Sequence, residues 1–154
     1  MTGTSALVAA VRTTKQFLTY VSAGPFQYAI AAGLGLPDAF YDGLAAGLRV
    51  QRDLLSDGLV AAGFEVFRPA GTYFVTTDIG GLAAAGLAAG SAESGDGLAF
   101  CRALPRLCGV VAVPNVVFYD TTAAGRSQVR FAFCKRPEVL AEAAARLGRL
   151  REAS

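Results

Sequence analysis

The chain has 154 residues, of which 53% are hydrophobic, a length and composition suited to one domain with a true core. Its 14 basic and 12 acidic residues are balanced and form no Lys/Arg run, so no nucleic-acid-binding footprint is present. The absence of histidine excludes Ser-His-Asp and Cys-His catalysis and histidine-based zinc sites, and no metal site is expected. Three cysteines without CxxC spacing indicate reduced thiols in a cytoplasmic protein.

The first part of the sequence is predicted to be helical. Residues 5–18 follow a candidate N-terminal cap at Ser5, and an alanine-rich helix is expected over 26–35 after a Gly-Pro break. The uncharged stretch 16–37 contains this break and several polar residues. It is therefore too interrupted and too polar for a membrane span.

A long amphipathic helix is expected from Pro37 to about Ala62. An ion pair from Arg49 to Asp53 is expected on its polar face, and Gly63 is placed to end the helix in a left-handed cap. The apolar stripe of this helix consists of Phe40, Leu44, Leu48, Leu55 and Leu59.

After this helix the hydrophobic period changes to two, which is typical of strands. β-Branched and aromatic runs predict strands near 65–67 and 72–77 around a Pro-Ala-Gly turn, and further strands near 110–113 and 128–134. The low-complexity segment 79–96 is rich in Gly and Ala. It predicts a flexible surface insertion rather than a phosphate-binding loop.

Two further helices complete the expected layout. Residues 98–104 predict a short helix that stops near Pro105, and a final helix is expected over 137–150 with a proline in its first turn. An ion pair between Glu142 and Arg146 is expected on one face of the final helix. The apolar face of that helix consists of Leu140, Ala143, Leu147 and Leu150. Helices that cover one face of a small, mostly antiparallel sheet define an α+β fold.

Arg130 is the only ionised residue between Arg126 and Lys135. Alternation along a strand places Val129, Phe131 and Phe133 on one face, which suits a core, and Gln128, Arg130, Ala132 and Cys134 on the other. A guanidinium among small neighbours leaves room for a ligand, and its planar fork of donors suits a carboxylate. The alternative is an arginine on an edge strand that pairs with a nearby carboxylate or is solvated.

Four segments follow one another in an order that is characteristic of one family. They are Leu18–Gln27, Phe64–Phe74, Val111–Tyr119, with its V-x-hydrophobic-P-x-x-x-F pattern, and Val129–Lys135, with its hydrophobic-R-F-x-F pattern. Together they resemble segments of the class I/II, fold-type-I aminotransferases that depend on pyridoxal phosphate. The similarity is closest to the kynurenine-, methionine- and N-succinyldiaminopimelate-type branch.

The resemblance implies that the chain is the C-terminal part of such an enzyme. Residues 1–36 would be connecting helices from a missing large domain, and 37–154 would be the small domain, with 79–96 as its insertion. The complete enzyme would transfer an amino group between an amino acid and a 2-oxo acid. We expect it to be a homodimer without a nucleic-acid or membrane partner.

The resemblance also implies roles for single residues. Arg130 aligns with the family arginine that binds the substrate α-carboxylate. Tyr20 and Ser22 lie in the loop that reaches the cofactor pocket of the neighbouring subunit, where Ser22 could bind the cofactor phosphate or make only a local turn hydrogen bond. Tyr73 and Tyr119 lie beside pocket positions, although burial as amphipathic core residues is favoured for both.

One departure from the family concerns lysine. The family's Schiff-base lysine lies in a Ser-x-x-Lys segment, and neither Lys15 nor Lys135, the two lysines of this chain, matches it. The chain therefore has no catalytic residue of its own, and we expect it to be inactive alone and not to hold pyridoxal phosphate covalently. A stand-alone α+β module that binds carboxylates or a protein, and a nonfunctional remnant, are the alternatives. Without a large domain, the apolar helices at 5–18 and 26–35 are expected to promote self-association.

Overall fold

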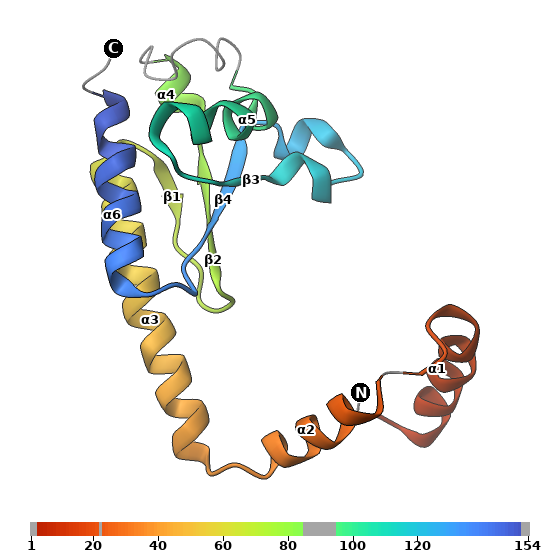
Figure 1. Cartoon of the computed structure of the whole chain (residues 1–154). Coiled ribbons are helices and arrows are strands. Elements are labelled where there is room, and N and C mark those ends of the chain that lie inside the picture. The colour runs from red at the N-terminus through yellow and green to blue at the C-terminus, as the bar shows by residue number, and fades with distance from the viewer. Residues whose placement is uncertain (1–2, 22, 85–94, 152–154) are drawn as a thin grey trace. The chain divides into compact units, whose positions relative to one another are not determined.

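The computed structural model describes residues 3–21, 23–84 and 95–151 (Figure 1). It divides into two compact units, one that ends at Asp42 and one that begins at Gly43. The assignment of 1–36 to connecting helices and of 37–154 to a small domain stays a prediction.

The N-terminal unit contains two helices, α1 (Ser5–Leu18) and α2 (Gly24–Leu34). Thr4 rather than Ser5 caps α1, because its hydroxyl accepts a hydrogen bond from the amide of Leu7 at 3.4 Å. Helix α2 begins two residues earlier than expected. A proline is tolerated in the first turn because its missing N–H would have no partner there.

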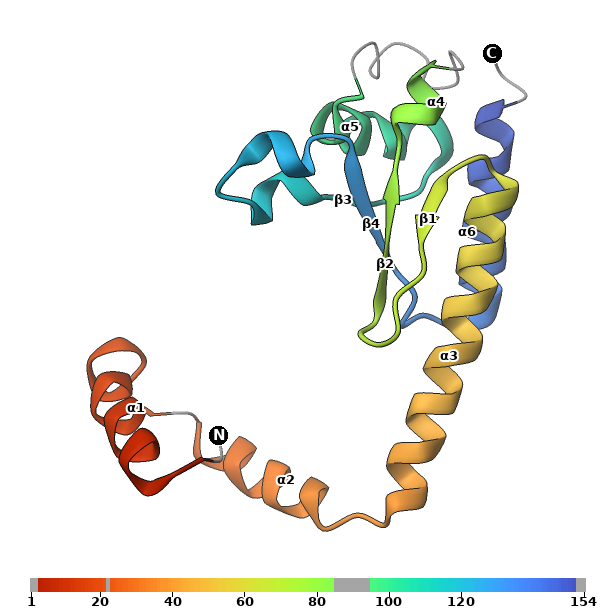
Figure 2. The ribbon, with the colours of Figure 1, turned by 180° about the vertical axis from the view of Figure 1, so that it is seen from behind.

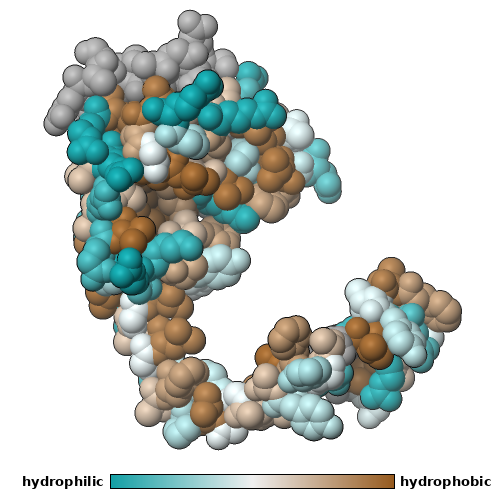
Figure 3. All heavy atoms as spheres, in the orientation of Figure 1, coloured by the Kyte–Doolittle hydropathy of each residue, from teal (hydrophilic) through white to brown (hydrophobic). Residues whose placement is uncertain are grey.

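Neither α1 nor α2 has a buried residue. Large apolar side chains are exposed on both helices, among them Phe17 (85%), Tyr28 (81%) and Leu34 (78%). Figure 3 shows apolar side chains, in brown, on the surface of this N-terminal segment. An apolar surface of this extent marks an association site.

The C-terminal unit is built on one antiparallel sheet with the strand order β1-β2-β4-β3. Its strands are β1 (Glu65–Phe67), β2 (Phe74–Asp78), β3 (Val113–Pro114) and β4 (Gln128–Ala132). The expected single sheet is confirmed, but β2 starts at Phe74 rather than at 72, because Thr72 has a φ of 65° and belongs to the turn. Strand β3 lies later than expected, because only Val113 and Pro114 pair with β4 and 110–112 are not strand. Strand β4 ends at Ala132 rather than at 134.

The helices of this unit pack against the sheet as expected, with one difference in extent. Helix α3 (Asp38–Ala61) ends as predicted, with Gly63 at a φ of 92°. Helix α5 (Gly97–Cys108) was expected to stop near Pro105 but continues through it to Gly109, which has a φ of 71°. Burial of Leu104 on this helix compensates for the hydrogen bond that the proline cannot donate.

The glycine- and alanine-rich segment contains a short helix, α4 (Gly80–Ala84), at its start. The Asp78 carboxylate accepts a hydrogen bond from the amide of Gly80 at 2.7 Å and so orders the first turn. Residues 80–84 of the predicted insertion are therefore helical, and its flexibility stays a prediction. Residues 85–94 of this segment lie outside the described residues.

The core lies between one face of the sheet and the helices. Helix α3 and helix α6 (Pro137–Gly148) run side by side on this face in both views (Figures 1 and 2). The expected core face of β4 is confirmed, since Val129 and Phe131 are 0% and 3% exposed, and Phe133 beyond the strand is 1% exposed. The residues of α3 and α6 that belong to the same core are Leu55, Leu59, Leu140 and Leu147.

Helix α3 approaches α6 closely at Gly58, and a pair of glycine substitutions in α3 tests this contact. A Cβ atom on Gly58 would lie 2.4 Å from the Cβ of Ala144, whereas a Cβ on Gly47 would meet nothing within 4 Å. We expect Gly47→Ala to raise the free energy of unfolding by ~0.5–1 kcal/mol through helix propensity. Gly58→Ala should lower it by ~1–2 kcal/mol, because overpacking outweighs that gain. Chemical denaturation of both variants measures these free energies of unfolding. Equal shifts in the two variants would contradict the close packing of Gly58 against Ala144.

The three cysteines differ in burial, and this predicts their reactivity. Burial raises the pKa of Cys101 to about 12 and also raises the pKa of Cys108, whereas Cys134 is exposed. A raised pKa lowers the thiolate fraction at a given pH, so Cys101 should hold roughly one thiolate in ten thousand at pH 8. We expect an aromatic disulfide reagent to modify Cys134 first and Cys101 only after denaturation. The fast phase should disappear in Cys134→Ser.

Candidate functional site

Arg130 lies in the middle of β4 on the face opposite the core. Its neighbours across the sheet are Thr76 on β2 and Val113 on β3. Strand β4 lies between these two strands, so Arg130 is not on an edge strand as the alternative interpretation required. The alternation of side chains therefore presents a half-buried guanidinium on the face of the sheet opposite α3 and α6.

Two aromatic rings surround this guanidinium. The Cζ atom of Arg130 lies 4.6 Å from the ring centroid of Phe74 and 3.9 Å from that of Phe118. Within the described ranges, no carboxylate forms an ion pair with Arg130. Rings that cover the face of a guanidinium leave the N–H donors at its edge for a planar acceptor such as a carboxylate.

A polar cluster fixes the turn that carries Phe118. The 3₁₀ turn η1 (Asn115–Phe118) follows β3, and the Oε1 atom of Gln128 on β4 accepts hydrogen bonds from Asn115 Nδ2 at 3.3 Å and from the Tyr119 hydroxyl at 3.4 Å. Asn115 is buried, and its Oδ1 has no partner among the residues that the structure describes. Because Gln128 and Arg130 share a face of β4, this cluster lies next to the guanidinium.

The tyrosines that the sequence singled out lie on the surface. Tyr73 is 57% exposed and contacts the ring of Phe74 edge to face at 5.6 Å, and Tyr119 is 41% exposed. The favoured interpretation of both as buried core residues is therefore wrong, because they flank the face of the sheet opposite the core. Tyr20, in the N-terminal unit, is 73% exposed. Ser22 lies outside the described residues.

Sequence reasoning missed Phe74 and Phe118 as neighbours of Arg130. The signal was present in the V-x-hydrophobic-P-x-x-x-F pattern, whose final residue is Phe118, but the pattern does not show what that ring contacts. The expected small neighbour Ala132 lies on the same face, opposite Phe74 in the β2–β4 pair.

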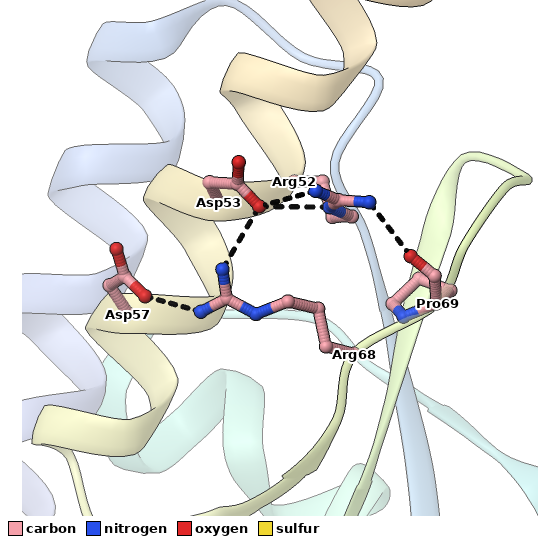
Figure 4. Close-up of polar contacts among 5 residues, drawn as sticks. All are labelled: Arg52, Asp53, Asp57, Arg68 and Pro69. Atoms are coloured by element: carbon pink, nitrogen blue, oxygen red, sulfur yellow. Dashed lines mark hydrogen bonds and ion pairs between the residues drawn. The ribbon is translucent and has the colours of Figure 1, made fainter.

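A network of charged side chains holds the β1–β2 hairpin on α3 (Figure 4). Arg52 donates to the carbonyl oxygen of Pro69 at 3.0 Å and lies 2.8 Å from Asp53, and Arg68 bridges Asp53 at 3.0 Å and Asp57. The hydrogen bond to Asp57 raises the pKa of Arg68. The hairpin that leads into Phe74 is thus anchored to α3 in two ways. Arg52 of the helix binds the carbonyl of Pro69, and Arg68 of the hairpin binds the helix carboxylates.

The pairing of Asp53 differs from the prediction of an ion pair with Arg49. In the structure Asp53 binds Arg52 and Arg68. Arg68 comes from the hairpin, so a tertiary contact replaces the local i, i+4 pair. The other predicted helix pair, between Glu142 and Arg146, is confirmed, with Arg146 Nε at 3.1 Å from Glu142 Oε1.

Neither lysine belongs to a strand of the sheet that carries Arg130. Lys15 is on α1 in the N-terminal unit, and Lys135 is exposed after β4 on the rim of a separate cavity of about 320 Å³. Across the described part of the chain there is also no group of three acidic or cysteine side chains that could hold a metal ion, and no helix is long and apolar enough to cross a membrane. The chemistry that this site offers is the binding of a planar anion.

Comparison with known proteins shows which class this fold and site belong to. The family model described as aminotransferase class I and II matches residues 1–147, so the chain belongs to this family. A probable N-succinyldiaminopimelate aminotransferase of Mycobacterium tuberculosis is 40% identical over 97% of this chain but only 37% of its own length. The kynurenine–oxoglutarate transaminase of Dictyostelium discoideum is 30% identical over 86% of this chain and 33% of its own.

Solved structures agree with this assignment. The N-succinyldiaminopimelate aminotransferase structure from Mycobacterium tuberculosis matches with a TM-score of 0.78 and 40% identity, covering 96% of this chain and 36% of that one. An Escherichia coli protein with a methionine aminotransferase function matches with a TM-score of 0.74 and 28% identity, covering 96% and 36%. The resemblance and the α+β fold are confirmed, and the chain spans little more than a third of the length of these relatives.

Proposed function

We propose that this chain contributes substrate recognition to a pyridoxal-phosphate-dependent aminotransferase that acts on an amino acid and a 2-oxo acid. Within it, Arg130 binds the α-carboxylate that both substrates share. The observation that supports this role is a half-buried guanidinium that is stacked by two rings and has no carboxylate partner among the described residues.

The residues of the chain act on the substrate by binding and orienting it. The planar fork of Arg130 donates two parallel hydrogen bonds to one carboxylate, which fixes the rotation of the substrate about that group. The rings of Phe74 and Phe118 exclude water from the guanidinium face, which strengthens the charge-assisted bonds. Holding the carboxylate in this way orients the Cα–H bond for reaction.

Pyridoxal phosphate, when bound, would supply the electron sink for this reaction. Neither Lys15 nor Lys135 lies beside Arg130 in the sheet, so the described residues do not fit covalent attachment of the cofactor. The Schiff-base lysine of the family would therefore belong to a part of the enzyme outside this chain. In a homodimer, Ser22 would reach the cofactor phosphate of the neighbouring subunit.

Arg130→Lys in the complete enzyme tests the carboxylate role. Lysine keeps the charge but loses the planar fork, so we expect kcat/KM for amino acids to fall roughly 30- to 1000-fold. This fall corresponds to a loss of about 2–4 kcal/mol of transition-state stabilisation. The matched control is Arg102→Lys, at an exposed position on α5. Turnover of Arg130→Lys within about twofold of the wild type would rule out the carboxylate assignment.

Reaction with pyridoxal phosphate tests the expected absence of a covalent site in this chain. After borohydride reduction, mass spectrometry should find Lys15 and Lys135 labelled only weakly and to similar extents, because both are exposed and neither has a pocket built for the cofactor. Stoichiometric labelling of one lysine in the folded chain, lost on denaturation, would contradict this.

A further inference from the structure

Building on the proposed role of Arg130, we propose that Phe118 is a positioning residue for substrate binding. Its ring, together with that of Phe74, holds the Arg130 guanidinium in its binding orientation before a carboxylate arrives. The hydrogen bonds of Gln128 to Asn115 and Tyr119 fix the turn that carries this ring.

The geometry of the rings supports a clamp. Phe74 is on β2 and Phe118 directly follows β3 in the turn η1, and these two strands flank β4 on opposite sides. The rings therefore reach the Arg130 guanidinium from the two flanks of its strand, at 4.6 and 3.9 Å from Cζ. Contacts from both sides restrict the rotation of a long side chain more than one contact would.

The surroundings of Phe118 indicate that it does not serve the core. Its side chain is 57% exposed, whereas the core phenylalanines Phe100, Phe131 and Phe133 are at most 3% exposed. A phenylalanine this exposed contributes little to stability through burial. Its ring instead contacts the Arg130 guanidinium. Substitution at this position should therefore leave the fold intact.

The turn that carries Phe118 is held in place from both ends. Gln128 Oε1 accepts two hydrogen bonds, from the buried Asn115 at the start of the turn and from Tyr119 just after it. A Cβ atom on Gly125 would lie 2.6 Å from the Tyr119 ring, so the next turn packs against that ring at a distance that only glycine allows. These contacts leave the ring of Phe118 little freedom to move away from Arg130.

A clamp of this kind improves binding by preorganisation. A free arginine side chain loses rotamer freedom when it binds a carboxylate, and this loss weakens binding. A guanidinium that is already stacked has lost this freedom in advance, while its edge N–H groups stay available. Phe118 would thus increase affinity for the carboxylate without touching it.

Arginine-labelled NMR of the 154-residue chain tests the clamp directly. In the wild type, the Arg130 Nε–Hε signal should be shifted upfield by the ring currents of Phe74 and Phe118. Phe118→Leu should move this signal toward its random-coil position, and Phe118→Tyr, which keeps the ring, should restore it. Val117→Ala, at a neighbouring position that is 60% exposed, is the matched control and should have no effect. Gln128→Ala should move the signal part of the way, because it frees the turn.

Titration with pyruvate, and with pyruvamide as its uncharged counterpart, separates this inference from the proposed function. Phe118→Leu should raise the Kd of pyruvate about three- to tenfold, the range expected when an arginine side chain must lose its rotamer freedom on binding. An Arg130 signal at its random-coil position in the wild type, or one that Phe118→Leu leaves unchanged, would overturn the clamp. An unchanged signal in Gln128→Ala would overturn the role of the polar cluster. If the signal depends on Phe118 but pyruvate does not perturb it, the clamp stands and the carboxylate role fails.

Discussion

The alternation of side chains along β4 is the constraint on which the rest of the structure depends. Val129 and Phe131 are 0% and 3% exposed, so only one register of this strand keeps both side chains in the core. A slip by one residue would move both into solvent and force the Arg130 guanidinium into an apolar interior, at a cost of several kcal/mol. The packing of α3 and α6 therefore determines the direction in which the candidate binding residue points, although neither helix touches the open face.

The parts of the fold that the sequence predicted are those with a local cause. The left-handed cap at Gly63, the final helix and the two faces of β4 each follow from residues close together in the chain. The errors arose where distant contacts decided the outcome. Pro105 stays inside α5 because Leu104 is buried in the core, and Asp53 binds Arg68 from the hairpin rather than its helical neighbour.

The candidate site likewise has one part that follows from local sequence and one part that depends on distant contacts. The position of Arg130 on a strand face with small neighbours could be inferred from spacing alone. The two rings against it could not, because Phe74 and Phe118 reach Arg130 from two other strands, and only the sheet order brings them together. Aromatic character predicted burial for Tyr73 and Tyr119. It failed because both tyrosines flank the face of the sheet opposite the core, where their rings stay exposed.

The two units differ in what they need from the rest of a protein. The C-terminal unit has its own core and anchors its hairpin to α3 through Arg52 and Arg68, so the elements around Arg130 are stabilised within this chain. Helices α1 and α2 bury no residue and expose large apolar side chains, which marks an association surface. The chain spans 37% of its Mycobacterium tuberculosis relative, which fits this division. The contacts around Arg130 are thus organised within the C-terminal unit, whereas α1 and α2 have no buried residue that would anchor them.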